Sequence, residues 1–284
     1  MLNQNPEGRN VRTSILTIAA SLVMTLGIGA ASADTLADVK AKGTLTIGVK
    51  NDYPPYGFLN DKGEIVGFEV DLGKYIAKEL LGPEGKVELV PVVAANRIEF
   101  LNSGRIDIIL ATLGVTEERG KVVDFSEYYV SAPGPSVIAP KAATFGKWEE
   151  LKGLTLCGIQ GSYYNKHLTG DLGVQLTAFK TQPEAYRALK DNRCVGFVFD
   201  DMTLRKKTAE AEWADYKIAL DPYEYIPQAA GIRKNDETFR DAVNKAIIKA
   251  EAEGKLIEWE ATYDMPPAKY IAERAKAAAA KLKP

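Results

Sequence analysis

The sequence contains very little histidine and cysteine. One histidine, His167, and two cysteines, Cys157 and Cys194, occur among 284 residues. This scarcity excludes a zinc site built on two or more histidines and every CxxC-type metal or redox motif. His167 is therefore the only candidate for a histidine-based catalytic triad. We predict neither a metal site nor a cofactor.

An excess of charge of one sign is also absent. The 36 basic and 38 acidic residues give a formal net charge of −2. Without a broad basic surface, nucleic-acid binding lacks its usual electrostatic basis. The apolar fraction of 46% is ample for a packed core. The length allows one large domain or two medium ones.

Long apolar runs are absent from the sequence except near its start. Arg9 and Arg12 precede an apolar stretch over residues 15–30, which ends at Ala31-Ser32-Ala33. These features predict a secretory signal peptide that is cleaved after Ala33. The alternative is a membrane anchor, but this run is shorter than the ~20 residues that a spanning helix needs. We expect an exported, soluble protein.

The two cysteines have two possible states. An oxidising compartment permits a disulfide between Cys157 and Cys194, which lie in or beside apolar, strand-like runs. The alternative is a pair of buried free thiols. The sequence leaves both open, because a disulfide demands a Cα separation that sequence does not reveal.

Two series of alternating strands and helices follow the leader. In the first, strands at 45–49, 87–92 and 106–111 alternate with helices at 69–81 and 96–103. In the second, strands at 155–159, 176–180 and 195–200 alternate with helices from about 163 and at 183–190. This alternation predicts parallel sheets with crossover helices, and the two series predict two α/β lobes.

Two segments are candidate connections between the lobes: 128–140, which contains three prolines, and 225–230. If the helix predicted at 237–252 packs on the first lobe, the chain crosses twice and forms a hinge. We read the Ala/Lys-rich segment 267–283 as a solvated surface helix. The predicted domains are a signal peptide (1–33), lobe 1 (34–132 plus 228–264), lobe 2 (133–227) and a helical tail (265–284).

Arg119 is a candidate for binding a carboxylate. It follows the strand at 106–111, and Thr116 is placed to cap the helix in which Arg119 lies. Open α/β sheets bind ligands at the carboxyl ends of their strands, where an arginine and free N–H groups suit an anion. The alternative is a surface pair between Arg119 and Glu117 or Asp124.

Asp200 is a candidate for binding an ammonium group. Asp200 and Asp201 end the apolar strand 195–199 of the second lobe. If Asp200 faces Arg119 across a cleft, the two residues would bind the ammonium and carboxylate groups of one α-amino acid. The alternative is an aspartate that caps the next helix, a role that fits Asp201 better.

Two further segments contribute weaker candidates. Gln160-Gly161-Ser162-Tyr163 is a strand-to-helix turn whose N–H groups suit an anion. Tyr53 lies in a proline-stiffened loop and is placed to cover a ligand, although a core role fits it equally well.

The order of several motifs resembles the extracytoplasmic solute-binding proteins of polar amino acid ABC transporters. The motifs are Tyr53-Pro54-Pro55-Tyr56, the run 63–72, Gly104-Arg105-Ile106-Asp107, Thr116-Glu117-Glu118-Arg119, Val123-Asp124-Phe125-Ser126, Gly161-Ser162, Phe199-Asp200-Asp201 and Gly231-Ile232-Arg233-Lys234. The resemblance covers about residues 36–264.

The resemblance implies an α/β, two-lobed periplasmic binding protein fold of type II, with two hinge crossovers. It implies a periplasmic monomer that binds one free L-amino acid and delivers it to a permease in the inner membrane. Arg119 would hold the ligand carboxylate and Asp200 the ammonium. Thr112, Gly114 and backbone groups near Ser162 and Tyr163 would lie beside the ligand, with Tyr53 as an aromatic cover.

The side chain of the ligand is suggested by two basic residues. Lys50, at the end of the first strand, and Arg97, in Asn96-Arg97, look like the corresponding residues of aspartate/glutamate-binding members. Two cations suit a second carboxylate, because a desolvated charge needs charged partners. The alternative is a solvent-exposed Lys50, an Arg97 paired with a structural acid, and a different polar amino acid. Gln182 also approaches the cleft in this reading.

An enzyme on the same fold is the competing hypothesis. The resemblance extends to periplasmic dehydratases that act on prephenate or arogenate, which need a general acid. No residue is clearly marked for that role, since His167 lies among polar residues and is expected to be solvated. A chemoreceptor or kinase sensor module is disfavoured, because no later apolar segment is long enough to cross a membrane.

Overall fold

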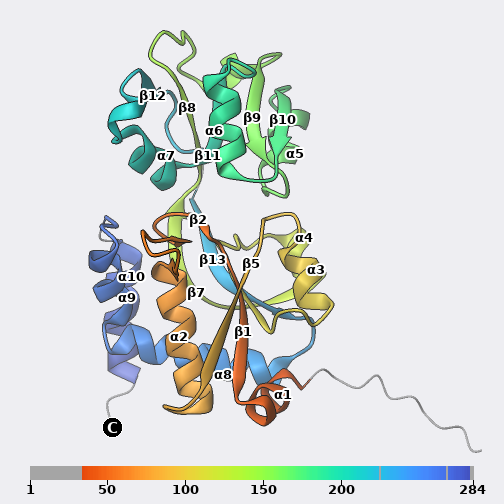
Figure 1. Ribbon diagram of the computed structural model, residues 1–284, viewed down its shortest axis with the longest axis vertical. Helices are drawn as coiled ribbons and strands as arrows, with labels where there is room; N and C mark the ends of the chain where they lie inside the picture. The colour runs from red at the N-terminus through yellow and green to blue at the C-terminus, as the bar shows by residue number, and fades with distance from the viewer. Residues whose placement is uncertain (1–33, 224, 267, 282–284) are drawn as a thin grey trace, which may run out of the picture. The chain divides into compact units, whose positions relative to one another are not determined.

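The computed structural model describes residues 34–223, 225–266 and 268–281. The predicted signal peptide lies outside these residues. Within them, no helix has both the length and the apolar character that crossing a membrane requires. The described chain contains two five-stranded sheets, and we call each sheet with its helices a lobe (Figure 1).

Lobe 1 is built on the sheet β5-β1-β6-β13-β7. Its strands are β1 (Thr44–Val49), β5 (Lys86–Pro91), β6 (Ile108–Leu110), β7 (Val123–Pro133) and β13 (Tyr225–Arg233). Its helices are α1 (Thr35–Lys42), α2 (Phe68–Leu81), α3 (Arg97–Asn102), α4 (Glu117–Gly120), α8 (Glu237–Ala252), α9 (Lys255–Thr262) and α10 (Lys269–Lys281). A small sheet of β2 (Asp52–Tyr53), β3 (Gly57–Leu59) and β4 (Ile65–Val66) lies between β1 and α2 in the sequence.

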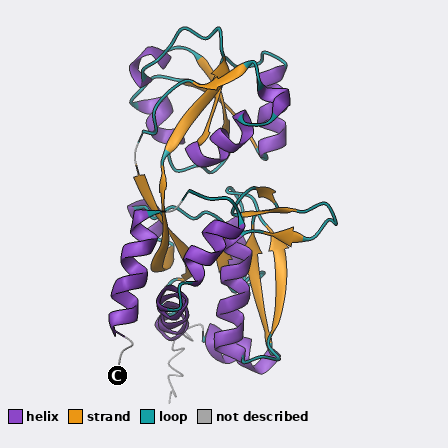
Figure 2. Cartoon of the chain, turned by 90° about the vertical axis from the view of Figure 1, so that its left-hand side faces the viewer, coloured by secondary structure: helices purple, strands orange, loops and turns teal. Residues whose placement is uncertain are grey.

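Lobe 2 is built on the sheet β10-β9-β11-β8-β12. Its strands are β8 (Pro135–Pro140), β9 (Thr155–Ile159), β10 (Gln175–Phe179), β11 (Gly196–Asp200) and β12 (Tyr216–Ile218). Its helices are α5 (Asn165–Gly170), α6 (Gln182–Lys190) and α7 (Asp201–Thr208), with short 3₁₀ turns η1 (Trp148–Leu151) and η2 (Ala211–Trp213). Figure 2 shows helices alongside the strands of both sheets.

The continuous apolar character of 106–111 follows from burial on both faces. Ile108 and Leu110 pack in the cluster formed with α2 and α8, whereas Ile109 and Ala111 pack in a second cluster with α3. All four side chains are fully buried. A strand covered on both sides loses the apolar–polar alternation of a half-exposed strand, as the sequence indicates here.

Both sheets are mixed rather than wholly parallel. β1 pairs in parallel with β5 and β6, and β9 pairs in parallel with β10 and β11. The segments expected to be connections form the antiparallel strands. β7 continues into β8 in lobe 2, and β13 returns to lobe 1 and pairs along β7. The alternation of strands and helices predicts only the parallel strand pairs, because a crossover helix connects parallel strands and says nothing about antiparallel neighbours.

Cys157 and Cys194 form a disulfide, which decides between the two states that the sequence left open. Their Cα atoms lie 5.6 Å apart, within the range that disulfides require. Cys157 is in β9, and Cys194 lies just before β11, which pairs with β9. Adjacent parallel strands thus bring together two residues that are 37 positions apart.

The expectation that the C-terminal segment is a solvated helix is wrong for one face of it. Ile271 and Ala278 of α10 are buried. Arg274 forms ion pairs with Glu251 of α8 and with Glu127 of β7. Small alanine side chains allow a close approach to α8, so a segment with few large apolar residues still packs on lobe 1.

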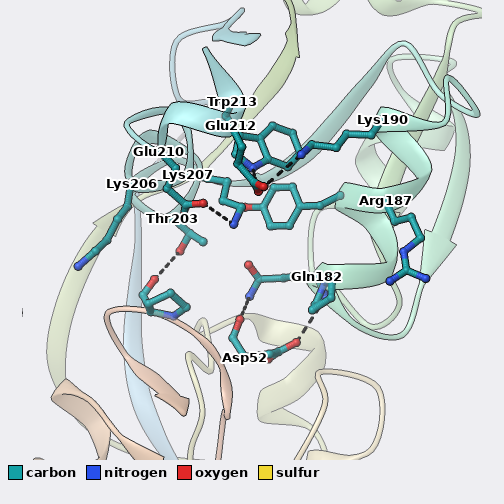
Figure 3. Close-up of a pocket in the computed structure, with 13 residues that line it drawn as sticks. Asp52, Gln182, Arg187, Lys190, Thr203, Lys206, Lys207, Glu210, Glu212 and Trp213 are labelled. Atoms are coloured by element: carbon teal, nitrogen blue, oxygen red, sulfur yellow. Dashed lines mark hydrogen bonds and ion pairs between the residues drawn. The ribbon is translucent and has the colours of Figure 1, made fainter. Parts of the chain in front are cut away.

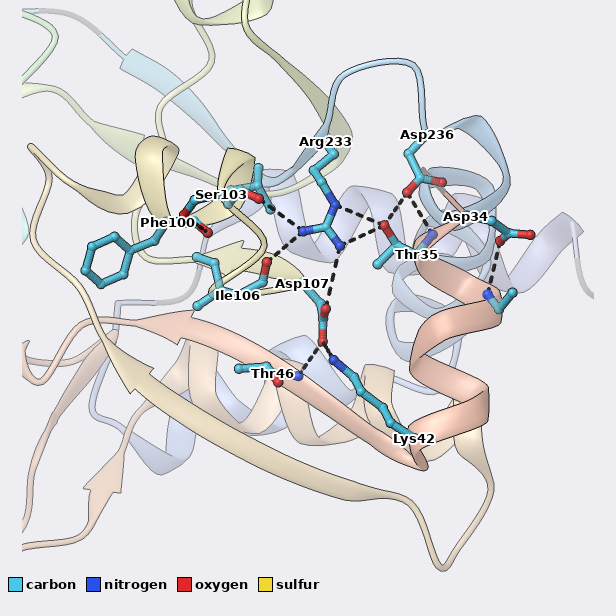
Figure 4. A network of polar contacts seen from close by, with 12 residues as sticks. Asp34, Thr35, Lys42, Thr46, Phe100, Ser103, Ile106, Asp107, Arg233 and Asp236 are labelled. Atoms are coloured by element: carbon cyan, nitrogen blue, oxygen red, sulfur yellow. Dashed lines mark hydrogen bonds and ion pairs between the residues drawn. The ribbon is translucent and has the colours of Figure 1, made fainter. Parts of the chain in front are cut away.

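A polar network around Arg233 ties the start of α1 to β13 and α8 (Figure 4). The Arg233 guanidinium donates to the Ile106 carbonyl at 2.8 Å and to Thr35 Oγ1 at 2.9 Å, and it pairs with Asp107 at 3.6 Å. Thr35 in turn donates to Asp236. Two motifs of the resemblance, 104–107 and 231–234, thus meet through Asp107 and Arg233.

We expect Arg233→Met to lower the free energy of unfolding by about 2 kcal/mol or more, because carbonyl and carboxylate groups would lose a buried charged partner. Urea denaturation measures this change. Arg187→Met, an exposed position on α6, is the matched control and should change stability by less than about 0.5 kcal/mol. Equal stability of the two variants would contradict a structural role for the network.

Candidate functional site

One small cavity collects residues from both lobes. Its lining residues are Lys50, Asp52, Tyr53, Ala94, Arg97, Thr112, Arg119, Ile159, Ser162, Tyr163, Tyr164, Lys180, Gln182, Phe199 and Asp200. Every sequence-predicted site residue except Gly114 is among them. The cavity measures about 40 Å³. This space holds a few water molecules, so an amino acid can enter only if side chains rearrange or the lobes separate.

Arg119 lies at the start of α4, after β6, as the sequence predicts. Thr116 caps the helix, because its hydroxyl accepts a hydrogen bond from Arg119 N–H at 3.2 Å. The guanidinium donates to the Gly114 carbonyl at 2.7 Å and to the Gly161 carbonyl of lobe 2 at 3.1 Å. Gly114 therefore contributes to the site through its backbone carbonyl, which holds Arg119, and does not line the cavity itself.

The alternative partners of Arg119 are engaged elsewhere. Glu117 pairs with Lys121 at 3.6 Å, and Asp124 pairs with Lys234 at 2.8 Å. Burial lowers the pKa of the Arg119 guanidinium from its usual value. The surface pairing that the sequence left open is not the arrangement in the structure.

Asp200 ends β11 at the carboxyl edge of the lobe 2 sheet, and its side chain makes no capping hydrogen bond among the described residues. Burial raises the pKa of Asp200 to about 7, with Lys50 lowering it and Asp201 raising it. The capping role favoured for Asp201 is wrong. Asp201 lies in the first turn of α7, where it accepts a hydrogen bond from Arg205 at 2.7 Å.

Lys50 is buried and has a carboxylate partner that the sequence did not suggest. Its ammonium lies 3.0 Å from Asp52 Oδ1 and 3.4 Å from the Val92 carbonyl. Burial lowers the pKa of Lys50, whereas Asp52 raises it. The alternative of a solvent-exposed Lys50 is therefore wrong. Spacing alone gave no signal for Asp52, because the register of β2 decides where its side chain points.

Arg97 is the second buried cation, with only 3% of its surface exposed. Its guanidinium donates a hydrogen bond to the Ala111 carbonyl, which is not the structural acid that the alternative required. Burial, followed by the charge of Arg119, lowers the pKa of Arg97 to about 9. Arg97 is therefore still protonated at pH 7.

Gln182 joins the two lobes at the edge of the cavity. Its side-chain amide donates to the Asp52 carbonyl at 3.0 Å, and its backbone N–H lies 3.4 Å from Asp52 Oδ2. Figure 3 shows this contact below a larger recess of about 400 Å³ between α6 and α7. The pair Asp52–Gln182 thus separates the small cavity from this recess.

Aromatic rings form the apolar walls. Tyr53 is 2% exposed and packs against Phe199, with ring centroids 4.8 Å apart. The Arg119 guanidinium lies 6.0 Å from the ring centre of Tyr163. Ser162 ends the turn after β9 and also lines the cavity. Tyr53 therefore serves both as a core residue and as a wall of the cavity, which combines the two predicted roles.

Glu69 is a functional candidate that the sequence analysis missed. It lies in the first turn of α2 and is fully buried. Its Oε1 accepts hydrogen bonds from Thr112 N–H at 2.7 Å and from the Tyr129 hydroxyl at 2.5 Å. Thr112 has a φ of 52°, a left-handed conformation that is rare for a β-branched residue. The sequence did contain a signal for this role, because Glu69 is an acidic residue on the apolar face of the helix predicted at 69–81.

His167 contributes no side chain to this cavity. It lies in α5, where its Nδ1 is 2.6 Å from Asp171 Oδ2 and its ring packs on Tyr223. Across the described ranges, no group of three His, Cys, Asp or Glu side chains is arranged to hold a metal ion.

Comparison with known proteins gives the family. Residues 45–265 match the bacterial extracellular solute-binding proteins, family 3. The chain belongs to this family. Among curated relatives, the glutamine-binding protein GlnH of Bacillus subtilis is 32% identical over 79% of this chain and 82% of its own length. The L-glutamate/L-aspartate-binding protein of Pseudomonas aeruginosa is 29% identical over 82% of each chain.

Solved structures agree with this assignment. The cysteine-binding protein of Campylobacter jejuni has a TM-score of 0.76 at 30% identity, over 81% of this chain and 92% of its own. The chain is thus a two-lobed substrate-binding protein of a polar amino acid transporter, and not an enzyme. Membership in this extracellular family implies a periplasmic location.

Proposed function

We propose that the protein binds one acidic L-amino acid, glutamate or aspartate, in the cavity between its lobes. Arg119 would hold the α-carboxylate and Asp200 the α-ammonium, as the resemblance implies. The two groups come from different lobes and line the same cavity. A ligand that contacts both lobes favours the closed state over the open one.

The balance of charge supports an acidic side chain. Lys50 is compensated by Asp52 at 3.0 Å, and the α-ammonium would compensate Asp200. The α-carboxylate would compensate Arg119. Arg97, whose guanidinium donates to a neutral carbonyl, is then the cation left for a second carboxylate when the neighbouring Glu69 carries a proton. This is the single observation that carries the proposal, because a buried cation without an anion is costly.

Export and delivery complete the proposal. The leader 1–33 would direct the chain through the membrane and be removed, and the closed monomer would present its ligand to an inner-membrane permease. Binding proteins for glutamine, cystine and arginine are among the relatives, so these amino acids are the competing ligands.

We expect glutamate or aspartate to raise the melting temperature more than glutamine, cystine, cysteine, arginine or histidine at equal concentration. Binding to the folded state alone stabilises the protein by mass action. Differential scanning fluorimetry with the mature chain, followed by calorimetric titration of each hit, makes the comparison. A stronger response to a neutral or basic amino acid would overturn the acidic proposal.

We expect Arg119→Ala and Arg97→Gln to fail in different ways. Arg119→Ala should abolish binding of every amino acid, because all share the α-carboxylate. Arg97→Gln should weaken glutamate binding by roughly 30-fold or more, the cost of leaving a buried charge unpaired, and leave glutamine little affected. Arg105→Gln, an exposed arginine of the same lobe, is the control. If Arg97→Gln weakens both ligands equally, Arg97 does not contact the side chain.

We expect the contribution of Asp200 to depend on pH. Its pKa is about 7 without ligand, and an α-ammonium requires the ionised carboxylate. Below that pKa a proton must leave before the ligand binds, so the affinity lost in Asp200→Asn should be about tenfold greater at pH 8 than at pH 6. Calorimetric Kd values of both proteins at the two pH values test this. A loss that is independent of pH would remove Asp200 from the ammonium role.

A further inference from the structure

Glu69 is a fully buried carboxyl group whose two oxygens have different surroundings. Oε1 accepts both of its hydrogen bonds, from Thr112 N–H and from the Tyr129 hydroxyl. Oε2 is buried and has no hydrogen-bond partner within the described part of the chain. A proton on Oε2 would therefore leave both existing hydrogen bonds in place.

Among the described residues, four titratable side chains interact with the charge of Glu69. Two are cations: Arg97 of α3, and Lys50 at the end of β1. Two are phenols: Tyr129 of β7, and Tyr56 in the turn between β2 and β3. Lys50 already has Asp52 as its partner, so Arg97 is the cation on which the charge of Glu69 acts most.

We propose that Glu69 determines which charge class of amino-acid side chain the site accepts. Ionised Glu69 compensates Arg97, and the site is then balanced for a neutral side chain. Glu69 protonated on Oε2 leaves Arg97 without an anion, and the site is then balanced for a side-chain carboxylate. Binding of an acidic amino acid thus favours the uptake of a proton from solvent onto Glu69.

The geometry keeps the site assembled in both states. Oε1 holds the N–H of Thr112, whose left-handed backbone needs support, whether or not Oε2 carries a proton. Protonation therefore changes the charge behind the cavity without removing a wall. Burial raises the pKa of Glu69 to about 7, while the two hydrogen bonds and the two cations lower it, so both states are populated near neutrality.

This inference rests on the proposed acidic ligand, and a ratio of affinities tests it. Glutamate and glutamine share the α-groups, so pH effects through Asp200 cancel in the ratio of their Kd values. The glutamate side chain stays ionised between pH 6 and pH 8. If its carboxylate raises the pKa of Glu69 by one unit, Kd(glutamine)/Kd(glutamate) rises about fivefold from pH 8 to pH 6.

Glu69→Gln supplies the second arm, because an amide cannot ionise but keeps an oxygen for Thr112 and Tyr129. Its Kd ratio should not change with pH and should stay near the wild-type value at pH 6. For the same one-unit shift, titrations at pH 7.5 in buffers of different ionisation enthalpy should show about half a proton less taken up by the variant than by the wild type.

A wild-type Kd ratio that is constant with pH, measured while glutamate binds, would overturn the role of Glu69 and leave the proposed function standing. Failure of glutamate to bind at any pH would instead refute the proposed function. If Glu69→Gln does not fold, the wild-type pH series decides alone. Glu99→Gln, an exposed position of α3, is the matched control and should follow the wild-type pH dependence.

Discussion

The site depends on one constraint, which is that charges removed from water need partners. Lys50 and Arg97 are buried, and Arg119 and Asp200 are half-buried. The protein supplies a carboxylate for Lys50, whereas the guanidinium groups of Arg97 and Arg119 donate hydrogen bonds to carbonyl oxygens. A carbonyl satisfies a hydrogen bond without neutralising the charge. The site therefore contains buried positive charge that is neutralised only when a ligand binds.

The fold explains why these groups meet. Parallel strands end at a common edge, so Lys50 after β1, Thr112 after β6 and Asp200 at the end of β11 lie at the edges where the two sheets face the cavity. The crossing strands β7 and β13 form antiparallel partners along much of their length. Tyr129 of β7 also donates to Glu69, which places a hydrogen bond between the site and a strand that runs between the lobes.

Much of this could be predicted from sequence, and the remainder depends on register and pairing. The strand at 155–159, the helix at 237–252 and the Thr116 cap are local features, set by periodicity and capping chemistry, and the structure has them. The partners of a buried charge depend on the path of the backbone and on tertiary contacts. Asp52 lies only two positions from Lys50, but the backbone direction after β1 decides whether the two side chains meet. Glu69 reaches Thr112 across 43 positions.

Among the described residues, the lobes contact each other through Tyr53 packed on Phe199 and through several polar pairs. The ion pair between Lys166 and Glu118 is short, at 2.6 Å, but both side chains are largely exposed, and such pairs contribute little. Gln182 and Arg119 each reach a carbonyl of the other lobe, which water can replace as an acceptor at small net cost. A ligand that neutralises the buried charges therefore adds a driving force for closure that these polar pairs do not supply. Burying these charges is costly without a ligand. For the same reason, closure is favoured only by an amino acid whose charges match them.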